Sequence, residues 1–293
     1  MEENEKTLKK SIGIVDVIIH LCVIIITVIC VLPFLYVLSI SFTATEVYVP
    51  LEFSIIPKKW SLEVYKTILS TSDFMVALKN TVIVTVGGTV LGGFFTFAFS
   101  YGLTKKDLPF RKFFLGMVIF GLLFDVGLIP NYLNIRSLGL INTHMALILP
   151  ALLTSYNVII ARSFIQGLPE ELEDAAKIDG CSYFAIFFRI VMPLAKASIA
   201  TLALFIAVDQ WNQYIKPLMY ITDYTKRTLQ VYVKTILVDA STTGLGVGDG
   251  NMTLPSETIR MATVVLSMLP VMCIYPFVQK YFVKGVMVGA VKG

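Results

Sequence analysis

Long apolar segments separated by shorter polar segments dominate this chain of 293 residues. A helix that crosses a bilayer needs about 20 mainly apolar residues. Six segments meet this requirement, at about 12–42, 80–104, 113–133, 141–165, 197–221 and 259–282. Because the bilayer core offers no water to backbone groups, such segments form helices. The pattern therefore predicts an all-α membrane protein, a six-helix bundle in a single domain over residues 1–293.

The first two apolar segments differ in what they indicate. The first follows Lys9 and Lys10 but is far longer than the apolar core of a signal peptide, which has about 7–15 residues. We expect it to be a retained span. The second is rich in glycine, a residue that lets helices approach closely and so favours a packed bundle over a lone anchor. Its glycines are Gly87, Gly88, Gly92 and Gly93.

The positions of lysine and arginine predict the orientation of the spans. Basic residues near span ends are enriched on the cytoplasmic side. If both termini are cytoplasmic, 14 of the 24 basic residues lie inside, most of them next to span ends. Two longer segments, 43–79 and 222–258, then lie outside, where each could reach a partner protein or form a mobile surface loop.

Composition supports a membrane protein and excludes several other classes. Hydrophobic residues make up 56% of the chain, charged residues 15%, and the mean hydropathy is +0.77, whereas soluble domains carry about 25% charged residues. The net charge of +4 comes without a basic, aromatic face of the kind that nucleic acid requires. Cysteines within apolar segments are expected to pack as small hydrophobic residues. We predict no metal site and no catalytic residues.

The most informative polar segment covers residues 166–196, between the fourth and fifth expected spans. Pro169 suits the first helical position, and the glutamates that follow it favour the positive end of the helix dipole. Gly180 is expected to end this helix in a left-handed cap. A second short helix is expected from Ser182 to Ile190, ending before Pro193. The two helices would form an elbow at the membrane surface.

One face of the first elbow helix is expected to be smooth. Four residues fall at helical spacing on that face, Leu172, Ala175, Ala176 and Asp179. The two alanine side chains are small enough for another protein to approach this face closely.

The spacing within the elbow is similar to the EAA loop of ABC importer permeases. Ala175 and Ala176 are followed at the family's intervals by Gly180, Ile190 and Pro193. Asp174 stands where the family has glutamate, and Met192 stands where it has leucine; both keep the chemical character. The resemblance implies the type I importer permease fold and a cytoplasmic coupling helix that docks into a groove of the ATPase subunit.

Other segments resemble carbohydrate-type permeases of the maltose-importer class, and in particular MalG-like, LplC/YtcP-type permeases. The similar segments are 60–65, 78–81, 139–143, 210–214, 217–220 and the ending 289–293. The resemblance implies that the C-terminal tail enters the ATPase dimer. It also implies that segment 222–258, with its glycine-rich stretch 244–250, contacts a solute-binding protein. The implied ATPase-coupling residues are Glu173, Asp174, Ala175, Ala176, Asp179, Gly180, Ile190, Pro193, Lys292 and Gly293.

Nucleotide chemistry is expected on a separate subunit, because the chain contains no G-x-x-x-x-G-K-[ST] phosphate loop. We therefore expect no cofactor on this chain and expect ATP and Mg²⁺ on partner ATPase subunits. The implied partners are a second permease subunit, a dimer of ATP-binding subunits and an extracytoplasmic solute-binding protein, within a bacterial cell membrane. The implied mechanism is alternating access, in which nucleotide and solute bias one two-state bundle.

Polar residues in the fifth span are candidates for the solute path, because buried polar groups in a membrane are costly and usually face a cavity or a partner. They are Asp209, Gln210, Trp211, Asn212, Gln213 and Tyr214. Helical spacing predicts that Asp209, Asn212 and Gln213 share one face. The alternatives are contacts with the partner permease or a position at the outer interface. Asn131 and Tyr132 form a second candidate group, and Asp125 is an isolated carboxylate.

Three other functions fit parts of the sequence. An ABC permease for a peptide, amino acid or osmolyte would have the same elbow but fits the tail and the Trp–Asn segment less well. An ion-coupled secondary transporter would show inverted repeats with matched intramembrane charges, which we do not see. A membrane signalling or scaffold subunit would need no polar cluster in its fifth span.

Overall fold

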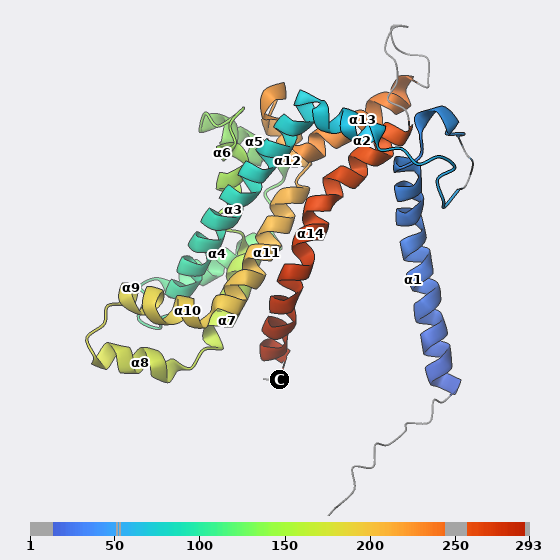
Figure 1. The fold of residues 1–293 in the computed structure, drawn as a ribbon. Helices are drawn as coiled ribbons and strands as arrows, with labels where there is room; N and C mark the ends of the chain where they lie inside the picture. Colours follow the sequence, from blue (N-terminus) through green and yellow to red (C-terminus); the bar gives the residue numbers. More distant parts are fainter. Residues whose placement is uncertain (1–13, 51, 53, 244–256, 291–293) are drawn as a thin grey trace, which may run out of the picture. The chain divides into compact units, whose positions relative to one another are not determined.

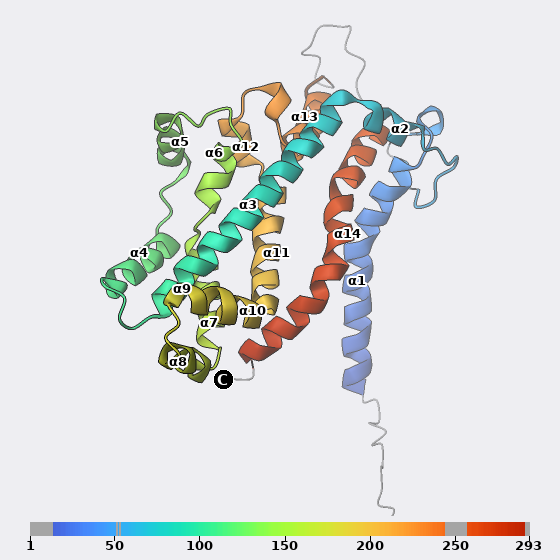
Figure 2. The ribbon, with the colours of Figure 1, turned by 60° about the vertical axis from the view of Figure 1, so that its left-hand side comes forward.

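The computed structural model describes residues 14–50, 52, 54–243 and 257–290 (Figures 1 and 2). The helices in chain order are α1 (Ile14–Ser41), η1 (Thr45–Val47), α2 (Glu63–Ser70), α3 (Ser72–Thr104), α4 (Arg111–Leu123), α5 (Leu128–Ser137), α6 (Met145–Ile148), η2 (Leu149–Ala151), α7 (Ser155–Gln166), α8 (Glu170–Ile178), α9 (Tyr183–Ile186), the π-helical turn η3 (Phe187–Val191), α10 (Met192–Leu194), α11 (Lys196–Asn212), α12 (Ile215–Tyr220), η4 (Tyr224–Lys226), α13 (Leu229–Thr243) and α14 (Glu257–Ala290). Within the described residues the only β pairing is an isolated bridge between Thr43 and Trp60. The expectation of an all-α protein is confirmed.

The chain divides into two compact units. The first consists of residues 1–67 and 253–265, and the second of residues 68–252 and 266–293. In the first unit, the Tyr65 hydroxyl donates a hydrogen bond to Ser41 Oγ at 2.7 Å. The Phe42 ring lies 5.0 Å from the Tyr65 ring, centroid to centroid. These contacts hold the end of α1 against α2.

Three of the described helices are long and apolar enough to cross a membrane: α1, α3 and the first part of α14. Two bent pairs also qualify if each is one span. Residues 145–151 and 155–166 meet at 47°, and residues 183–194 and 196–212 meet at 83°. By length and composition the described residues therefore hold three such helices, or up to five.

The third expected span, 113–133, is broken into α4 and α5. Phe124 has extended backbone at the end of α4, and Gly127 has a φ of +84° before α5. The Asp125 carboxylate accepts a hydrogen bond from the Gly127 N–H at 3.0 Å. A short polar side chain that bonds the nearby backbone competes with helix formation, and glycine adopts the positive φ without strain. The apolar pattern continues through this break and therefore does not reveal it.

Helix α3 is the centre of the second unit, and its glycines let α11 and the α6–α7 region approach it closely. A Cβ added to Gly88 would lie 2.7 Å from Gln210 Nε2, and one added to Gly92 would lie 3.1 Å from the Ala151 carbonyl oxygen. The expected role of glycine in close packing is confirmed at these positions. Gly93 does not have this role, since a Cβ added there would have no neighbour within 4 Å.

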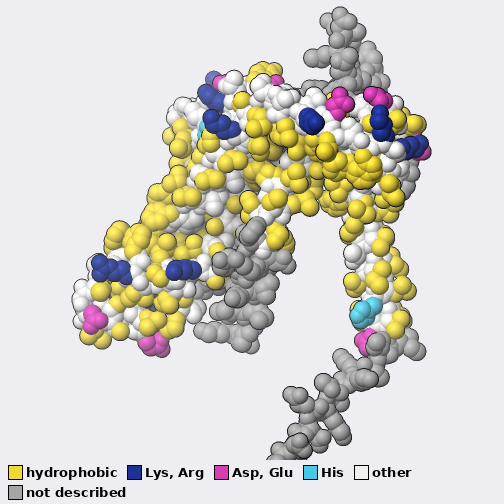
Figure 3. All heavy atoms as spheres, in the orientation of Figure 1, with side chains coloured by type: hydrophobic (Ala, Val, Ile, Leu, Met, Phe, Trp, Pro, Cys, Tyr) yellow, Lys and Arg dark blue, Asp and Glu magenta, His cyan; other side chains and the backbone are white. Residues whose placement is uncertain are grey.

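Charged and hydrophobic side chains occupy different parts of the second unit. In the view of Figure 3, hydrophobic side chains cover the middle of α3, and charged side chains lie near α8 and α9 and also at the opposite end. Exposed hydrophobic residues on α3 include Val86, Val90 and Phe95. This distribution suits a helix that is surrounded by lipid along its middle and by water at its end.

Candidate functional site

The first arm of the elbow is α8, and its two ends follow the expected signals closely. Pro169 caps the helix, which begins one residue later than expected, at Glu170. At the other end Gly180 has a φ of +80°. Its N–H bonds the Lys177 carbonyl at 3.0 Å, and the Cys181 N–H bonds the Ala176 carbonyl at 2.9 Å. These two bonds form a Schellman motif, so the predicted left-handed cap at Gly180 is confirmed.

The second arm is longer than expected. Ser182 Oγ accepts a bond from the Ala185 N–H and caps the start of α9. The helix does not stop before Pro193 but continues to Leu194 through the π-helical turn. In that turn the Met192 N–H bonds the Phe187 carbonyl, five residues back. Pro193 follows directly and has no N–H with which to continue this pattern, and the helix continues to Leu194.

The two alanines of the elbow have different surroundings. Ala176 is buried and packs with Ile165, Ile186 and Phe187 in the core of the second unit. Ala175 is exposed. The expected shared patch is therefore divided, because neighbouring helix positions point about 100° apart. One alanine anchors α8 to the bundle, and the other faces outward.

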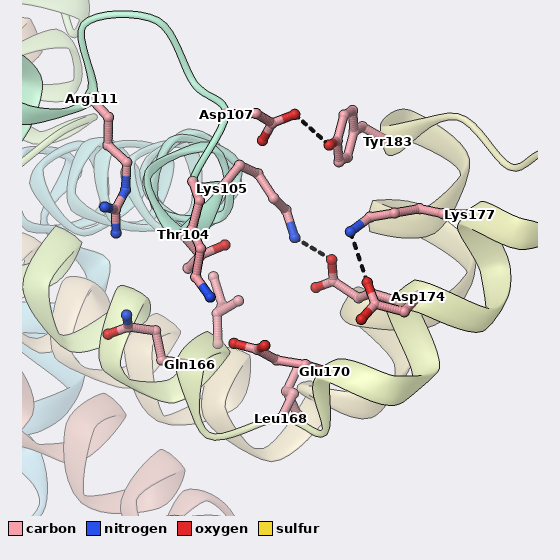
Figure 4. A pocket seen from close by; sticks show the side chains of 13 residues that line it. Thr104, Lys105, Asp107, Arg111, Gln166, Leu168, Glu170, Asp174, Lys177 and Tyr183 are labelled. Carbon is pink, nitrogen blue, oxygen red and sulfur yellow. Dashed lines mark hydrogen bonds and ion pairs between the residues drawn. The ribbon is translucent and has the colours of Figure 1, made fainter.

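Behind α8 lies a polar cavity of about 400 Å³ (Figure 4). Its centre is an ion pair between Lys105, at the end of α3, and Glu173 of α8. Their side chains are only 15% and 16% exposed. The Tyr101 hydroxyl lies 3.4 Å from the same Glu173 carboxylate oxygen, and Lys105 Nζ lies 4.0 Å from the centroid of the Tyr101 ring. The pair is therefore shielded from water and held from two sides.

A second contact joins the other arm of the elbow to the same loop. The Tyr183 hydroxyl donates a hydrogen bond to Asp107 Oδ2 at 2.6 Å. This bond stabilises the charged carboxylate and lowers the pKa of Asp107. On α8 itself, Lys177 Nζ lies 3.0 Å from Asp174 Oδ1, and this hydrogen bond raises the pKa of Lys177. Residues 105–107 thus contact both arms of the elbow.

The remaining elbow candidates lie apart from this cavity. Asp179 and Pro193 are exposed, and Ile190 packs against the core. Lys292 and Gly293 lie outside the described residues, as does the glycine-rich stretch 244–250.

The polar cluster of the fifth expected span separates into two groups. Asp209 and Asn212 are exposed on one face of α11. They line a cavity of about 770 Å³ together with Thr154, Tyr156, Asn157, Leu204, Phe205, Val208 and Tyr275. The expected shared face of Asp209 and Asn212 is confirmed. This cavity contains one carboxylate and, among its lining residues, no basic side chain.

The other members of the cluster point into the bundle. Gln210 is 3% exposed, and Trp211 is 6% exposed with its Nε1 donating to the Ser267 carbonyl at 3.3 Å. Gln213 was expected beside Asp209 but donates its side-chain amide to Gln210. The prediction is wrong here because α11 ends at Asn212 and the backbone of Gln213 is no longer helical. Tyr214 is partly buried.

The second candidate group does not line this cavity. Asn131 is exposed and donates to the Gly127 carbonyl at 2.8 Å. The Tyr132 ring lies 6.2 Å from the Tyr220 ring, centroid to centroid. Both residues stabilise the irregular region around α5.

Two asparagines near the opposite end of α3 hold the segment before α13. Asn142 has a φ of +62°, and its side-chain oxygen accepts bonds from the N–H groups of Thr222 and Asp223 at 2.7 and 3.0 Å. Asn80 donates to the carbonyls of Thr225 and Arg227 at 2.9 and 3.0 Å. Segments 78–81 and 139–143, singled out by their resemblance to known permeases, thus fix residues 222–227 in place.

Several residues of both cavities were not expected from the sequence. Glu173 was named from the sequence, but its partner Lys105, 68 residues away, was not, and neither were Asp107 and Tyr183, which are 76 apart. Such pairs carry no local periodicity that would identify them. The same holds for Tyr156, Asn157 and Tyr275. Within the described ranges, no group of three or more His, Cys, Asp and Glu side chains could hold a metal ion.

Comparisons with known proteins agree with this architecture. Residues 11–288 match the family described as binding-protein-dependent transport system inner membrane component. The chain is 44% identical to protein LplC of Bacillus subtilis over 269 residues, which cover 90% of each chain. It is 40% identical to the polygalacturonan/rhamnogalacturonan transport system permease protein YtcP of the same organism, over 95% of this chain and 98% of the relative.

Among solved structures, one chain of a bacterial ABC transporter involved in the import of the acidic polysaccharide alginate is similar, with a TM-score of 0.84. That chain is 28% identical, and the match covers 93% of this chain and 98% of the other.

Proposed function

Because this chain belongs to the family of inner membrane components of binding-protein-dependent transport systems, we propose that it is the permease subunit of an ABC importer for an oligosaccharide. The observation that carries this proposal is the match of nearly the whole chain to a polysaccharide transport permease and to an alginate importer chain. The elbow supports the same function, since its capped first arm presents an exposed alanine to a partner.

The elbow is the proposed contact with the ATP-binding subunits. Ala175, Asp179 and Ile178 are exposed on α8, while Ala176 holds the helix to the bundle. A small, exposed side chain allows the close approach that docking into a groove requires. ATP and Mg²⁺ would be bound by those partner subunits. A second permease and a solute-binding protein would complete the importer, with both termini of this chain in the cytoplasm.

The cavity beside α11 is the proposed part of the solute path on this chain. Asp209, Asn212 and Asn157 can hydrogen-bond sugar hydroxyls, and Tyr156 and Tyr275 can pack against sugar rings. The similar solved structure belongs to a transporter that imports the acidic polysaccharide alginate, yet the lining of this cavity carries a carboxylate and no basic residue. A carboxylate repels a uronate, so the cavity suits neutral sugar units.

The test compares wild type with Gly180→Asp in the complete importer, reconstituted with its second permease, ATP-binding subunits and binding protein. The substitution removes the glycine that the left-handed cap favours, and no atom lies within 4 Å of the added Cβ. We expect an assembled complex that loses both binding-protein-stimulated ATP hydrolysis and transport. Gly93→Ala, also without a neighbour within 4 Å, is the matched control and should behave as wild type.

Two outcomes would contradict this function. One is wild-type transport that continues without the ATP-binding subunits. The other is a Gly180→Asp complex with wild-type stimulation and transport.

A further inference from the structure

We propose that Lys105 and Asp107 are positioning residues that fasten both arms of the elbow to the end of α3, so that a displacement of α8 by the ATP-binding subunit is passed directly to α3. The proposal rests on the function proposed above. It assigns to the loop after α3 a mechanical role that the elbow sequence alone does not indicate.

The first fastening is the ion pair between Lys105 and Glu173. Both side chains are about 85% shielded, and the lysine ammonium also lies over the Tyr101 ring. Surface ion pairs contribute little, because water and salt screen them. A shielded pair is different, since removal of one partner leaves a poorly solvated charge behind. The pair therefore resists separation when α8 is displaced.

The second fastening holds the other arm independently. Tyr183 lies at the start of α9, and its hydroxyl bonds the Asp107 carboxylate at 2.6 Å. A hydrogen bond to an ionised acceptor is stronger than one between neutral groups. Figure 4 shows Lys105 and Asp107 reaching from the α3–α4 loop toward α8 and α9. Because this bond is exposed to water, it contributes less than the shielded ion pair, but it gives the elbow a second point of attachment to the loop.

Helix α3 connects these fastenings to the proposed solute path. Gly88 of α3 lies against Gln210 of α11, with no space for a Cβ. Asp209 and Asn212, on the same helix α11, line the cavity. A displacement of α3 therefore changes the position of α11 through direct packing. Coupling between sites requires such a contiguous element with two arrangements.

The alternative is that the elbow acts only through its covalent connections to α7 and α11. In that case α8 would move α7 and α11, and the contacts of residues 105–107 would only stabilise the fold. The two possibilities differ in the amount of solute moved per ATP hydrolysed. If the contacts of Lys105 and Asp107 transmit the displacement, their loss leaves ATP hydrolysis intact but lowers the amount of solute transported for each ATP.

The experiment measures that ratio in proteoliposomes that contain the complete importer and its binding protein. Lys105→Ala and Glu173→Ala are each expected to lower transport per ATP by about 5-fold or more, with normal co-purification of the subunits. The exchange Lys105→Glu with Glu173→Lys is expected to restore most of the ratio. Tyr183→Phe removes only the hydroxyl and is expected to lower the ratio about 2-fold. Lys112→Ala is the control, since Lys112 is an exposed lysine of α4 that does not line this cavity, and it should leave the ratio unchanged.

Each outcome decides for or against the proposal. Wild-type ratios in Lys105→Ala and Glu173→Ala would overturn it while leaving the proposed function intact. Failure of these variants to assemble, without recovery in the charge exchange, would also overturn it, because the residues would then be only structural. If wild type itself showed no stimulated hydrolysis or transport, the proposed function would fail first.

Discussion

Asp209 is a single carboxylate on the exposed face of α11, in a cavity whose other lining residues are neutral. Its neighbours along the chain, Gln210 and Trp211, are buried in the bundle. Within a single helical turn, one side chain therefore faces the proposed solute path and the next two stabilise packing. A carboxylate accepts hydrogen bonds from sugar hydroxyls and repels a sugar acid, so the proposed path predicts that this one residue affects both affinity and selectivity.

We predict that Asp209→Asn lowers transport of a neutral oligosaccharide by about 2- to 10-fold, because it removes one charge-assisted hydrogen bond. The same substitution should raise the transport of a uronate-containing oligosaccharide relative to the neutral one. Uptake of both radiolabelled substrates by proteoliposomes measures this. Asp73→Asn, an exposed carboxylate at the start of α3, should change neither. Equal uptake by Asp209→Asn and wild type for both substrates would remove Asp209 from the path.

At the scale of elements, α3 carries most of the packing of the second unit, and its tolerance to added volume differs along its length. An added Cβ at Gly88 would lie 2.7 Å from the side-chain amide of the buried Gln210, whereas at Gly93 it would meet nothing within 4 Å. Overpacking of a tight core forces neighbours out of their preferred geometry.

We predict that Gly88→Ala destabilises the folded protein by about 1–3 kcal/mol, while Gly93→Ala is neutral or slightly stabilising, since alanine favours helix over glycine. The thermal unfolding midpoint in detergent, followed by tryptophan fluorescence, measures the difference. Gln210→Ala should restore much of the loss in Gly88→Ala, because it removes the atoms that clash. If the two alanine variants unfold at the same temperature, the close approach of α3 and α11 is not tight.

The elements also show how far the sequence predicts the fold. The length of the apolar segments identified the long helices, since every helix that crosses a bilayer needs about 20 mainly apolar residues. The cap at Gly180 was predictable because a positive φ is a local property of glycine. The break at Gly127 and the continuation of the helix through Pro193 could not be predicted. The first depends on a hydrogen bond that interrupts a helix and the second on one that extends a helix, and neither changes the apolar pattern. The ion pair of Lys105 and Glu173 depends on tertiary packing alone.

At the scale of the whole molecule, the proposed function requires ATP-binding partners, because the sequence contains no G-x-x-x-x-G-K-[ST] phosphate loop. We predict that the permease pair without ATP-binding subunits neither releases phosphate from ATP nor accumulates solute. Addition of those subunits and of the binding protein should establish both activities. Phosphate release and solute uptake in the same proteoliposomes measure this. Uptake driven by a sodium or proton gradient in the pair alone would instead indicate a secondary transporter.

The length of α3 has a consequence for the distance over which the molecule can act. A helix of 33 residues is about 50 Å long, whereas the hydrocarbon core of a bilayer is about 30 Å thick. Lys105 follows one end of α3, and Asn80 near the other end holds residues 225–227. The two residues are separated by about 38 Å along the helix axis. A stiff rod that tilts about its middle moves its two ends in opposite directions at once. If the elbow contacts the ATP-binding subunits as proposed, tilting of α3 would pass a displacement at Lys105 to Asn80 and residues 225–227 in one step, with no series of side-chain changes in between.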